Sequence, residues 1–357
     1  MTKILFLCAP GQETFVKPVA EHFKTLPDYQ VKECYSDKKD EVIQTVSWAD
    51  IVWQEWADPL CAAVTRHPTM LDNKKLIIRL HSYEVLQYVG GYIKDIDWDR
   101  CDALICVADH VRIEAVTQIT KLTNLNKNFE TFVIPNGVDM EKFPLTEDGW
   151  DVGVVNKVKN KGKNIAYIGS VTDKKGPMLM LHAFDKLVHG TICYSGEEGS
   201  ISLRQPRPDY KLHVAGDFYD LRYLHYWEHM TKEMKLENNI VLHGRVENMP
   251  EFLKTMHYVV CSSPWESQNM SVMEAMATGC MPLVHNFPGS KNIYPEMFVW
   301  TTIDEFVDKI LTMPWSPSTF RKIIQERYDF KDRIKDIEEV MKITQAPSYG
   351  ESFDVKG

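Results

Sequence analysis

The sequence predicts an α/β protein with two open parallel sheets in tandem. Short, continuously apolar runs alternate with amphipathic stretches along the chain, and this alternation restarts after the polar, basic segment Asn156–Lys163. The length of 357 residues is that of about two domains. Apolar strands joined by helices are what a parallel sheet covered on both faces requires.

The first domain is expected to span residues 1–155. A helix is expected to follow Gly11, from about Glu13 to Leu26. The apolar runs are far enough apart for a crossover helix between successive strands. The strands predicted from these runs are Ile4–Cys8, Ile51–Trp53, Lys75–Leu80, Ala103–Val107 and Phe132–Ile134.

The second domain is expected to span residues 156–317. Pro177 suits the first position of a helix that runs to about Val188. The segment Thr191–Tyr210 is rich in Gly, Ser and Pro and predicts a long surface loop. The predicted strands are Ile165–Ile168, Leu212–Ala215, Ile240–Leu242, Tyr258–Cys261 and Met281–Val284.

Residues 318–357 are expected to form a separate C-terminal segment. After Pro314 and Pro317 comes a helical stretch, roughly Thr319–Ile343, that is interrupted near Tyr328–Phe330. It follows the last predicted strand of the second sheet, so we expect it to pack back on the first domain.

Composition excludes several protein classes. A hydrophobic share of 44% and a charged share of 25% are typical of a soluble folded protein, and no apolar run approaches the roughly 18–20 residues of a membrane span. The N-terminus lacks the pattern of a signal peptide. The eight cysteines include no CxxC pair, and several lie in apolar runs, which predicts reduced thiols and a cytoplasmic location.

The two halves differ in charge. Residues 1–155 hold 16 Lys and Arg against 24 Asp and Glu, a net charge of −8. A domain with this net negative charge offers a poor surface for binding anionic lipid or a nucleic-acid backbone. We therefore do not expect a nucleic-acid partner, although a local basic groove stays open as an alternative.

Ligands of open α/β sheets bind beyond the carboxyl ends of the strands. The residues that directly follow the predicted strands are therefore the candidates for a site. They are Gly11, His81, Asn136, Gly169, Gly216, Arg245 and the stretch from Ser262 to Ser271.

The strongest local feature begins at Glu266 and ends at Glu274, in the order Glu-Ser-Gln-Asn-Met-Ser-Val-Met-Glu. A helix is predicted to start near Met270, so that the N–H groups of Asn269, Met270 and Ser271 are available to an anion. Two carboxylates beside an anion site suit a nucleotide sugar, because they accept hydrogen bonds from sugar and ribose hydroxyls. Taken alone, the two glutamates fit better a capping carboxylate plus a solvated helix glutamate, so the anion site needs support from the surrounding motifs.

Four ordered motifs resemble glycosyltransferase family 4, the retaining enzymes of the GT-B fold. They are Ile134–Phe143, Ile168–Gly176, the stretch from Ser262 through Glu266 and Glu274 to Gly279, and Glu326–Phe330. The resemblance implies two Rossmann-like domains that face an interdomain cleft, with a C-terminal helix that crosses back to the first domain. It also implies that the second domain binds the donor and the first binds the acceptor.

The resemblance implies roles for individual residues. Lys175 is similar to the lysine that contacts the donor diphosphate, and Glu266 and Glu274 to the residues that hold the transferred sugar and the ribose. His81 resembles a histidine that faces the donor sugar. The expected catalytic residues are His81, Lys175 and Glu266; the expected donor-binding residues are Gly11, Gly169, Ser170, Lys174, Arg245, Asn269, Met270, Ser271 and Glu274; and the expected acceptor-binding residues are Trp56 and Tyr83.

The chain departs from the family pattern in two places. Ser170 stands where the family commonly has Arg, so one phosphate-binding cation is missing unless Lys174 or Arg245 replaces it. Gln268 and Asn269 stand where the family often has an aromatic residue and a glycine.

A DxD pattern at Asp95–Asp97 precedes a strand instead of ending one, and we expect no metal site there.

The sequence therefore predicts a retaining, metal-independent glycosyltransferase that moves a sugar from a nucleotide sugar to a hydroxyl of a glycan or small molecule. A front-face route is expected, and no cofactor, since the nucleotide sugar is a substrate. Three alternatives stay open: a catalytically silent nucleotide-sugar or glycan-binding protein of the same fold, a nucleotide-sugar epimerase, and a transferase acting on modified DNA bases.

Overall fold

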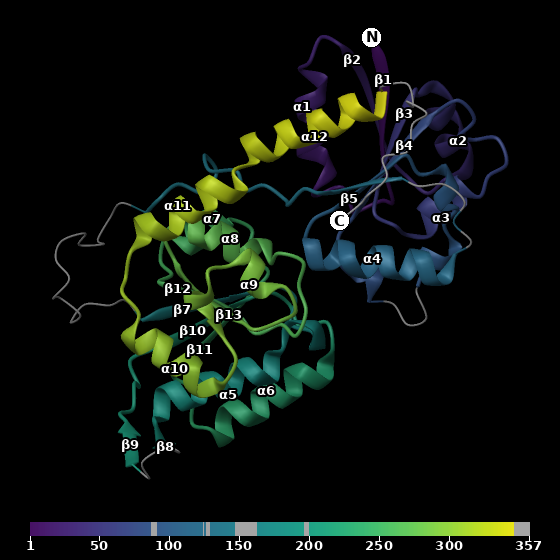
Figure 1. Cartoon of the computed structure of the whole chain (residues 1–357). Helices are drawn as coiled ribbons and strands as arrows, with labels where there is room; N and C mark the ends of the chain where they lie inside the picture. The colour runs from purple at the N-terminus through teal and green to yellow at the C-terminus, as the bar shows by residue number, and fades with distance from the viewer. Residues whose placement is uncertain (87–90, 124, 126–128, 147–162, 196–199, 346–357) are drawn as a thin grey trace. The chain divides into compact units, whose positions relative to one another are not determined.

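The structure is a computed structural model that describes residues 1–86, 91–123, 125, 129–146, 163–195 and 200–345 (Figure 1). It divides into two compact units, Met1–Asn136 with Lys331–Gly357, and Gly137–Phe330. Each unit is described by itself.

The first unit is built on a six-stranded parallel sheet in the order β2-β1-β3-β4-β5-β6. Its central strands are continuously apolar and buried, as in β1, where Ile4–Cys8 are fully buried. The strands are β1 (Thr2–Cys8), β2 (Tyr29–Tyr35), β3 (Ile51–Glu55), β4 (Lys75–Leu80), β5 (Ala103–Cys106) and β6 (Glu130–Val133). The helices are α1 (Val16–Lys24), α2 (Lys39–Trp48), α3 (Pro59–Thr65), α4 (Asp109–Leu122) and α12 (Phe330–Gln345), with the short 3-10 helix η1 (Tyr83–Val85).

The second unit holds a parallel sheet of six strands in the order β11-β10-β7-β12-β13-β14. Figure 1 shows α5 and α6 on one side of this sheet and α8 on the other. The strands are β7 (Asn164–Ile168), β10 (Lys211–Ala215), β11 (Ile240–Gly244), β12 (Tyr258–Cys261), β13 (Met281–His285) and β14 (Val299–Trp300). The helices are α5 (Pro177–His189), α6 (Leu221–Glu233), α7 (Met249–Leu253), α8 (Met270–Ala277), α9 (Ser290–Ile293), α10 (Ile303–Thr312) and α11 (Pro317–Tyr328), with the 3-10 helix η6 (Asp173–Lys175).

The predicted fold class, two parallel-sheet α/β domains, is confirmed. The expected boundary between residues 155 and 156 lies outside the described residues, but the chain already joins the second unit at Gly137. Val138 donates its N–H to the carbonyl of Tyr328 at 2.7 Å, and Phe143 is buried in the core of the second unit.

The C-terminal helical stretch is shared between the units. α11 packs against α8 in the second unit. From Lys331 onward α12 belongs to the first unit, where Ile334 and Ile337 are buried and Glu338 Oε1 lies 2.7 Å from His22 Nε2. Only the residues after Phe330 thus belong to the first unit, and not the whole predicted segment 318–357.

The predicted loop at Thr191–Tyr210 was wrong. The segment forms an antiparallel hairpin of β8 (Thr191–Ser195) and β9 (Ser200–Arg204). Apolar residues alternate with polar ones at 192, 194, 201 and 203, which is a strand pattern that the Gly and Ser content obscures. Arg204 anchors the hairpin to α10 through Asp304 at 2.6 Å and Asp308 at 2.7 Å.

Candidate functional site

Two lysines and a glutamate meet at the carboxyl ends of β7 and β12. These strands are neighbours in a parallel sheet, so the segments that follow them lie at the same edge. Lys175 Nζ lies 2.5 Å from Glu266 Oε1, and Lys174 Nζ lies 3.9 Å from Oε2 of the same carboxylate. Ser263 donates a hydrogen bond to Glu266 Oε1 at 2.8 Å. The structure thus brings together three of the residues predicted for the donor site.

The turn that carries the lysines is pinned to the end of β12. The carbonyl oxygen of Lys175 accepts hydrogen bonds from Tyr167 Oη at 2.9 Å and Ser262 Oγ at 2.8 Å. Gly176 ends η6 in the left-handed region, with φ of 63°. Gly169 lets the Lys175 side chain lie close, because an added Cβ would be 3.3 Å from Lys175 Cε.

We expect Gly176→Ala to destabilise the second unit by about 3 kcal/mol, since the new Cβ would lie 2.1 Å from the carbonyl oxygen of Ser262 and φ would be strained. The matched control is Gly244→Ala, where φ is 62° but the nearest atom, Asp217 Oδ1, is 3.5 Å away. That variant should lose about 1 kcal/mol. Urea unfolding of both variants measures the difference, and equal losses would contradict the account.

The first turn of α8 lies directly after Glu266. Asn269 adopts the left-handed conformation, with φ of 59°, at the N-cap of the helix. Asn tolerates this conformation better than most residues, which accounts for its presence where the family often has glycine. The N–H groups of Met270 and Ser271 have no intrahelical partner, because they belong to the first turn. This end of α8 therefore has free N–H groups of the kind that bind an anion.

Glu274 lies one turn into α8. Burial raises the pKa of its carboxyl to about 7, and the positive charge of Lys142 opposes this shift. Lys142 belongs to the segment that enters the second unit after Gly137, and its place near Glu274 was not predicted from the sequence. Its only signal was its position in the Ile134–Phe143 motif.

We expect Glu274 to make the protein less stable as pH rises from about 4.5 to about 7. Its folded pKa lies above the ordinary value of 4.5, so the folded state binds the proton more tightly across this window and loses that advantage at higher pH. Glu274→Gln removes the effect, worth about 3 kcal/mol at most. Urea unfolding should therefore show a larger gain for the variant at pH 7.5 than at pH 5, and equal gains at the two pH values would refute this.

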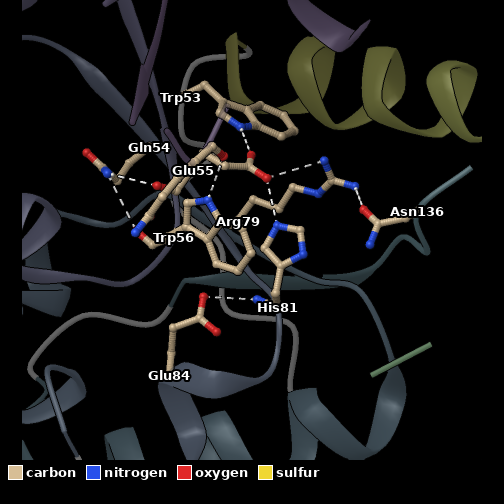
Figure 2. Close-up of polar contacts among 9 residues, drawn as sticks. Trp53, Gln54, Glu55, Trp56, Arg79, His81, Glu84 and Asn136 are labelled. Carbon is tan, nitrogen blue, oxygen red and sulfur yellow. Dashed lines mark hydrogen bonds and ion pairs between the residues drawn. The ribbon is translucent and has the colours of Figure 1, made fainter. Parts of the chain in front are cut away.

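A second cluster lies in the first unit, at the carboxyl ends of β3 and β4. The Glu55 carboxylate is its centre (Figure 2). Glu55 Oε1 lies 2.7 Å from His81 Nε2 and 3.6 Å from Arg79 Nη1, and Oε2 accepts a hydrogen bond from Trp53 Nε1 at 2.8 Å. Asn136 Oδ1 accepts from Arg79 Nη2 at 2.5 Å. The cluster fixes the side chain of His81.

All the charged members of this cluster are buried. Burial by itself would raise the pKa of Glu55, but Arg79 and then His81 outweigh it and hold that pKa below its ordinary value. Glu84 accepts a hydrogen bond from the His81 backbone N–H at 3.1 Å, and burial raises the pKa of Glu84 to about 7. Sequence reasoning missed Glu55 and Arg79. The sequence pattern that could have identified them is a charged residue inside or at the end of an apolar strand, because a buried charge requires a partner.

Trp56 and Tyr83 lie beside His81. The Trp56 ring stacks on the imidazole with centroids 3.9 Å apart, and its centroid lies 5.3 Å from that of Tyr83. Phe15 lies on the same imidazole, at 4.8 Å. The two predicted acceptor residues and His81 thus belong to one aromatic group, which Phe15 completes.

The remaining predicted residues lie apart from these clusters or contribute only backbone. Gly11 has φ of 81° but nothing within 4 Å of an added Cβ. Ser170 is exposed in the turn after β7, and Arg245 is exposed beyond the edge strand β11. Of the two candidates to replace the missing cation, Lys174 approaches Glu266, whereas Arg245 follows a strand that β10 separates from β7.

The aspartates of the DxD pattern have local partners. Asp95 pairs with Arg66 at 3.2 Å, and Asp97 accepts from the N–H of Asp99 at 3.2 Å. Within the described ranges, no group of three or more His, Cys, Asp and Glu is placed to hold a metal ion. The helices in those ranges include none that is long and apolar enough to cross a membrane.

The Lys175–Glu266 cluster lies in a segment with known relatives. Residues 154–297 match the family Glycosyl transferases group 1. The chain is also 26% identical, over 224 residues, to an Escherichia coli UDP-Gal:alpha-D-GlcNAc-diphosphoundecaprenol alpha-1,3-galactosyltransferase. The aligned region is 57% of this chain and 53% of that protein, so the match spans about half of the relative's length.

Solved structures share the fold over nearly the whole chain. HepE from Anabaena, in complex with UDP and glucose, has a TM-score of 0.69 at 14% identity, covering 96% of this chain and 100% of that one. Sucrose-phosphate synthase from Thermosynechococcus elongatus has a TM-score of 0.69 at 12% identity, covering 96% and 99%. The fold is therefore GT-B.

Proposed function

We propose that the protein is a glycosyltransferase that moves a sugar from a uridine diphosphate donor to a hydroxyl acceptor. The observation that carries the proposal is the convergence of Lys174 and Lys175 on Glu266 beside the first turn of α8. This arrangement lies inside the family match at 154–297. The galactosyltransferase relative names UDP-Gal as its donor, and the HepE structures contain UDP, UDP with glucose, or UDP-glucose, which supports uridine as the base.

The lysines and the helix end suit the leaving group. Breaking the bond between the anomeric carbon and the diphosphate leaves negative charge on the phosphate oxygens. Once the diphosphate is bound, the two ammonium groups and the N–H groups of Met270 and Ser271 stabilise that charge. Because the lysines supply the positive charge, we propose that transfer proceeds without a divalent metal and is unaffected by EDTA.

In the structure, the Glu266 carboxylate pairs with the two lysines. We propose that it exchanges these partners for the substrate when the donor binds. When the diphosphate binds Lys175, the carboxylate becomes available to accept hydrogen bonds from the hydroxyls of the transferred sugar. We propose a retaining, front-face reaction in which the new bond forms on the face that the diphosphate leaves. The acceptor hydroxyl gives its proton to the departing phosphate oxygen.

Product analysis tests the proposal. The full chain is incubated with UDP-galactose, UDP-glucose or UDP-N-acetylglucosamine and a panel of glycosides, and the products are examined by mass spectrometry and NMR. We expect a new glycosidic bond with the anomeric configuration of the donor, and UDP as co-product. A chain that binds UDP but neither transfers nor hydrolyses any donor would instead be the silent binding protein.

A further inference from the structure

We propose that Tyr294 is a positioning residue of the donor site: its hydroxyl holds the peptide unit between Gln268 and Asn269, and thereby aims the N–H groups in the first turn of α8 at the diphosphate. This inference rests on the proposed function and adds to it a residue that touches no substrate itself. Tyr294 lies well beyond the stretch from Glu266 to Glu274, and its role was not predicted from the sequence.

The hydroxyl of Tyr294 lies against the backbone between Glu266 and α8. It donates a hydrogen bond to the carbonyl oxygen of Gln268. The same Oη lies 3.4 Å from the carbonyl oxygen of Asn269. Tyr294 and both of these residues are buried. Burial raises the pKa of Tyr294 well above its ordinary value, so the hydroxyl keeps its proton and remains a donor.

This hydrogen bond fixes the orientation of one peptide unit. The carbonyl of Gln268 and the N–H of Asn269 belong to the same planar trans unit, so they point in opposite directions. When the carbonyl points at Tyr294, the N–H of Asn269 points away from it. The carbonyl oxygen of Asn269 accepts hydrogen bonds from the N–H groups of Val272 at 3.1 Å and Met273 at 3.3 Å. Holding this peptide unit therefore also holds the first turn of α8.

The conformation of Asn269 explains why such a support is needed. Its φ is 59° and its ψ is 80°, in the left-handed region. Asparagine tolerates this region, but glycine adopts it at lower cost. A residue other than glycine keeps such a conformation only when its surroundings enforce it. The carbonyls on both sides of the Asn269 Cα atom lie near the Tyr294 hydroxyl, which therefore enforces it here.

Tyr294 is itself held by the helices around it. It directly follows α9, and its N–H donates to the carbonyl of Ser290 at 2.8 Å. The carbonyl of Ile293 accepts hydrogen bonds from Tyr328 Oη at 2.9 Å and from Arg327 Nη1 at 3.4 Å, both on α11. Tyr294 thus cannot shift without breaking contacts in α9 and α11. A support of this kind keeps the N–H donors of α8 aimed before charge develops on the leaving group.

Binding of UDP and of uridine to the full chain tests this inference. Uridine carries the base and the ribose without the diphosphate, so the two probes separate the diphosphate contacts from the rest of the site. The variant is Tyr294→Phe, which removes only the hydroxyl. The matched control is Tyr258→Phe, which removes another buried hydroxyl at the amino end of β12. Isothermal titration calorimetry measures the Kd for UDP, saturation-transfer difference NMR measures uridine binding, and urea unfolding shows that each variant is folded.

We expect the Kd for UDP to rise about ten-fold in Tyr294→Phe, the effect of losing one well-placed hydrogen bond to a charged group. It should stay at the wild-type value in Tyr258→Phe, and uridine binding should stay unchanged in both variants. Adding Asn269→Gly to Tyr294→Phe should recover part of the UDP affinity, because glycine adopts the left-handed conformation without the hydroxyl.

Wild-type UDP affinity in Tyr294→Phe, an equal loss in Tyr258→Phe, or an equal loss for uridine and UDP would overturn the inference, as would no recovery with Asn269→Gly. If Tyr294→Phe does not fold, Tyr328→Phe takes its place, because it frees only the carbonyl of Ile293; wild-type UDP affinity in that variant would overturn the inference. Failure of the wild type to bind UDP would contradict the proposed function as well, whereas the outcomes above contradict the role of Tyr294 alone.

Discussion

Replacing Lys175 by alanine is expected to lower turnover roughly 100- to 1,000-fold, the usual effect of removing one preorganised donor that stabilises developing charge. Lys175 Nζ lies 2.5 Å from Glu266 Oε1, and its side chain is only 21% exposed, so solvent weakens its field less than that of a surface lysine. Lys174 Nζ lies 3.9 Å from Glu266 Oε2, and its side chain is 41% exposed. Replacing Lys174 by alanine should therefore lower turnover less.

The control for this variant is Lys254→Ala in the same unit. Lys254 is 44% exposed and pairs with Glu251 three residues earlier, so it reports the loss of an ordinary surface lysine. Steady-state kinetics of UDP release should show full activity for Lys254→Ala and the large loss for Lys175→Ala. Equal activities would remove Lys175 from the mechanism.

Arg79→Met is expected to destabilise the first unit by about 3–5 kcal/mol. The substitution leaves the Glu55 carboxylate fully buried with one cation fewer, and an uncompensated buried charge costs that much. The double variant Arg79→Met with Glu55→Leu removes both charges and should recover much of the loss, because well-packed apolar residues often replace a buried ion pair at little cost.

Urea unfolding of wild type, Arg79→Met, Glu55→Leu and the double variant measures this non-additivity. The transitions of the two units should be followed separately, since a chain of two units need not unfold in one step. A loss below about 1 kcal/mol for Arg79→Met would show that the ion pair does not hold the cluster. A double variant whose loss of stability equals the sum of the losses of the two single variants would also show that the ion pair does not hold the cluster.

Most central strands of the two sheets were readable from the sequence because their burial is continuous. Ile51–Trp53 and Tyr258–Cys261 are apolar without interruption, as strands covered on both faces must be. β2 was missed for the opposite reason. It is an edge strand in which Gln30, Lys32 and Glu33 interrupt the apolar residues and only Cys34 is buried, so it carries no apolar run.

The site was partly readable, to the extent that its residues follow strands. Glu266 and His81 were named because each stands near the carboxyl end of a predicted strand, and Lys175 was named because its segment resembles the family motif. The residues that hold these side chains in place were not predicted. The burial of Glu55 and Arg79 arises only when β3 and β4 pair, and the left-handed backbone of Trp56 depends on contacts with Gln12 and Arg79.

Nucleotide binding tests the central claim most directly. Melting temperatures of wild type, Lys175→Ala and Lys254→Ala would be compared with and without UDP, GDP, ADP and dTDP. A ligand that binds only the folded chain raises the melting temperature. We predict a rise with UDP that is smaller in Lys175→Ala and unchanged in Lys254→Ala. A well-folded wild type that none of the four nucleotides stabilises would contradict the claim that the Lys174–Lys175–Glu266 cluster binds a nucleoside diphosphate.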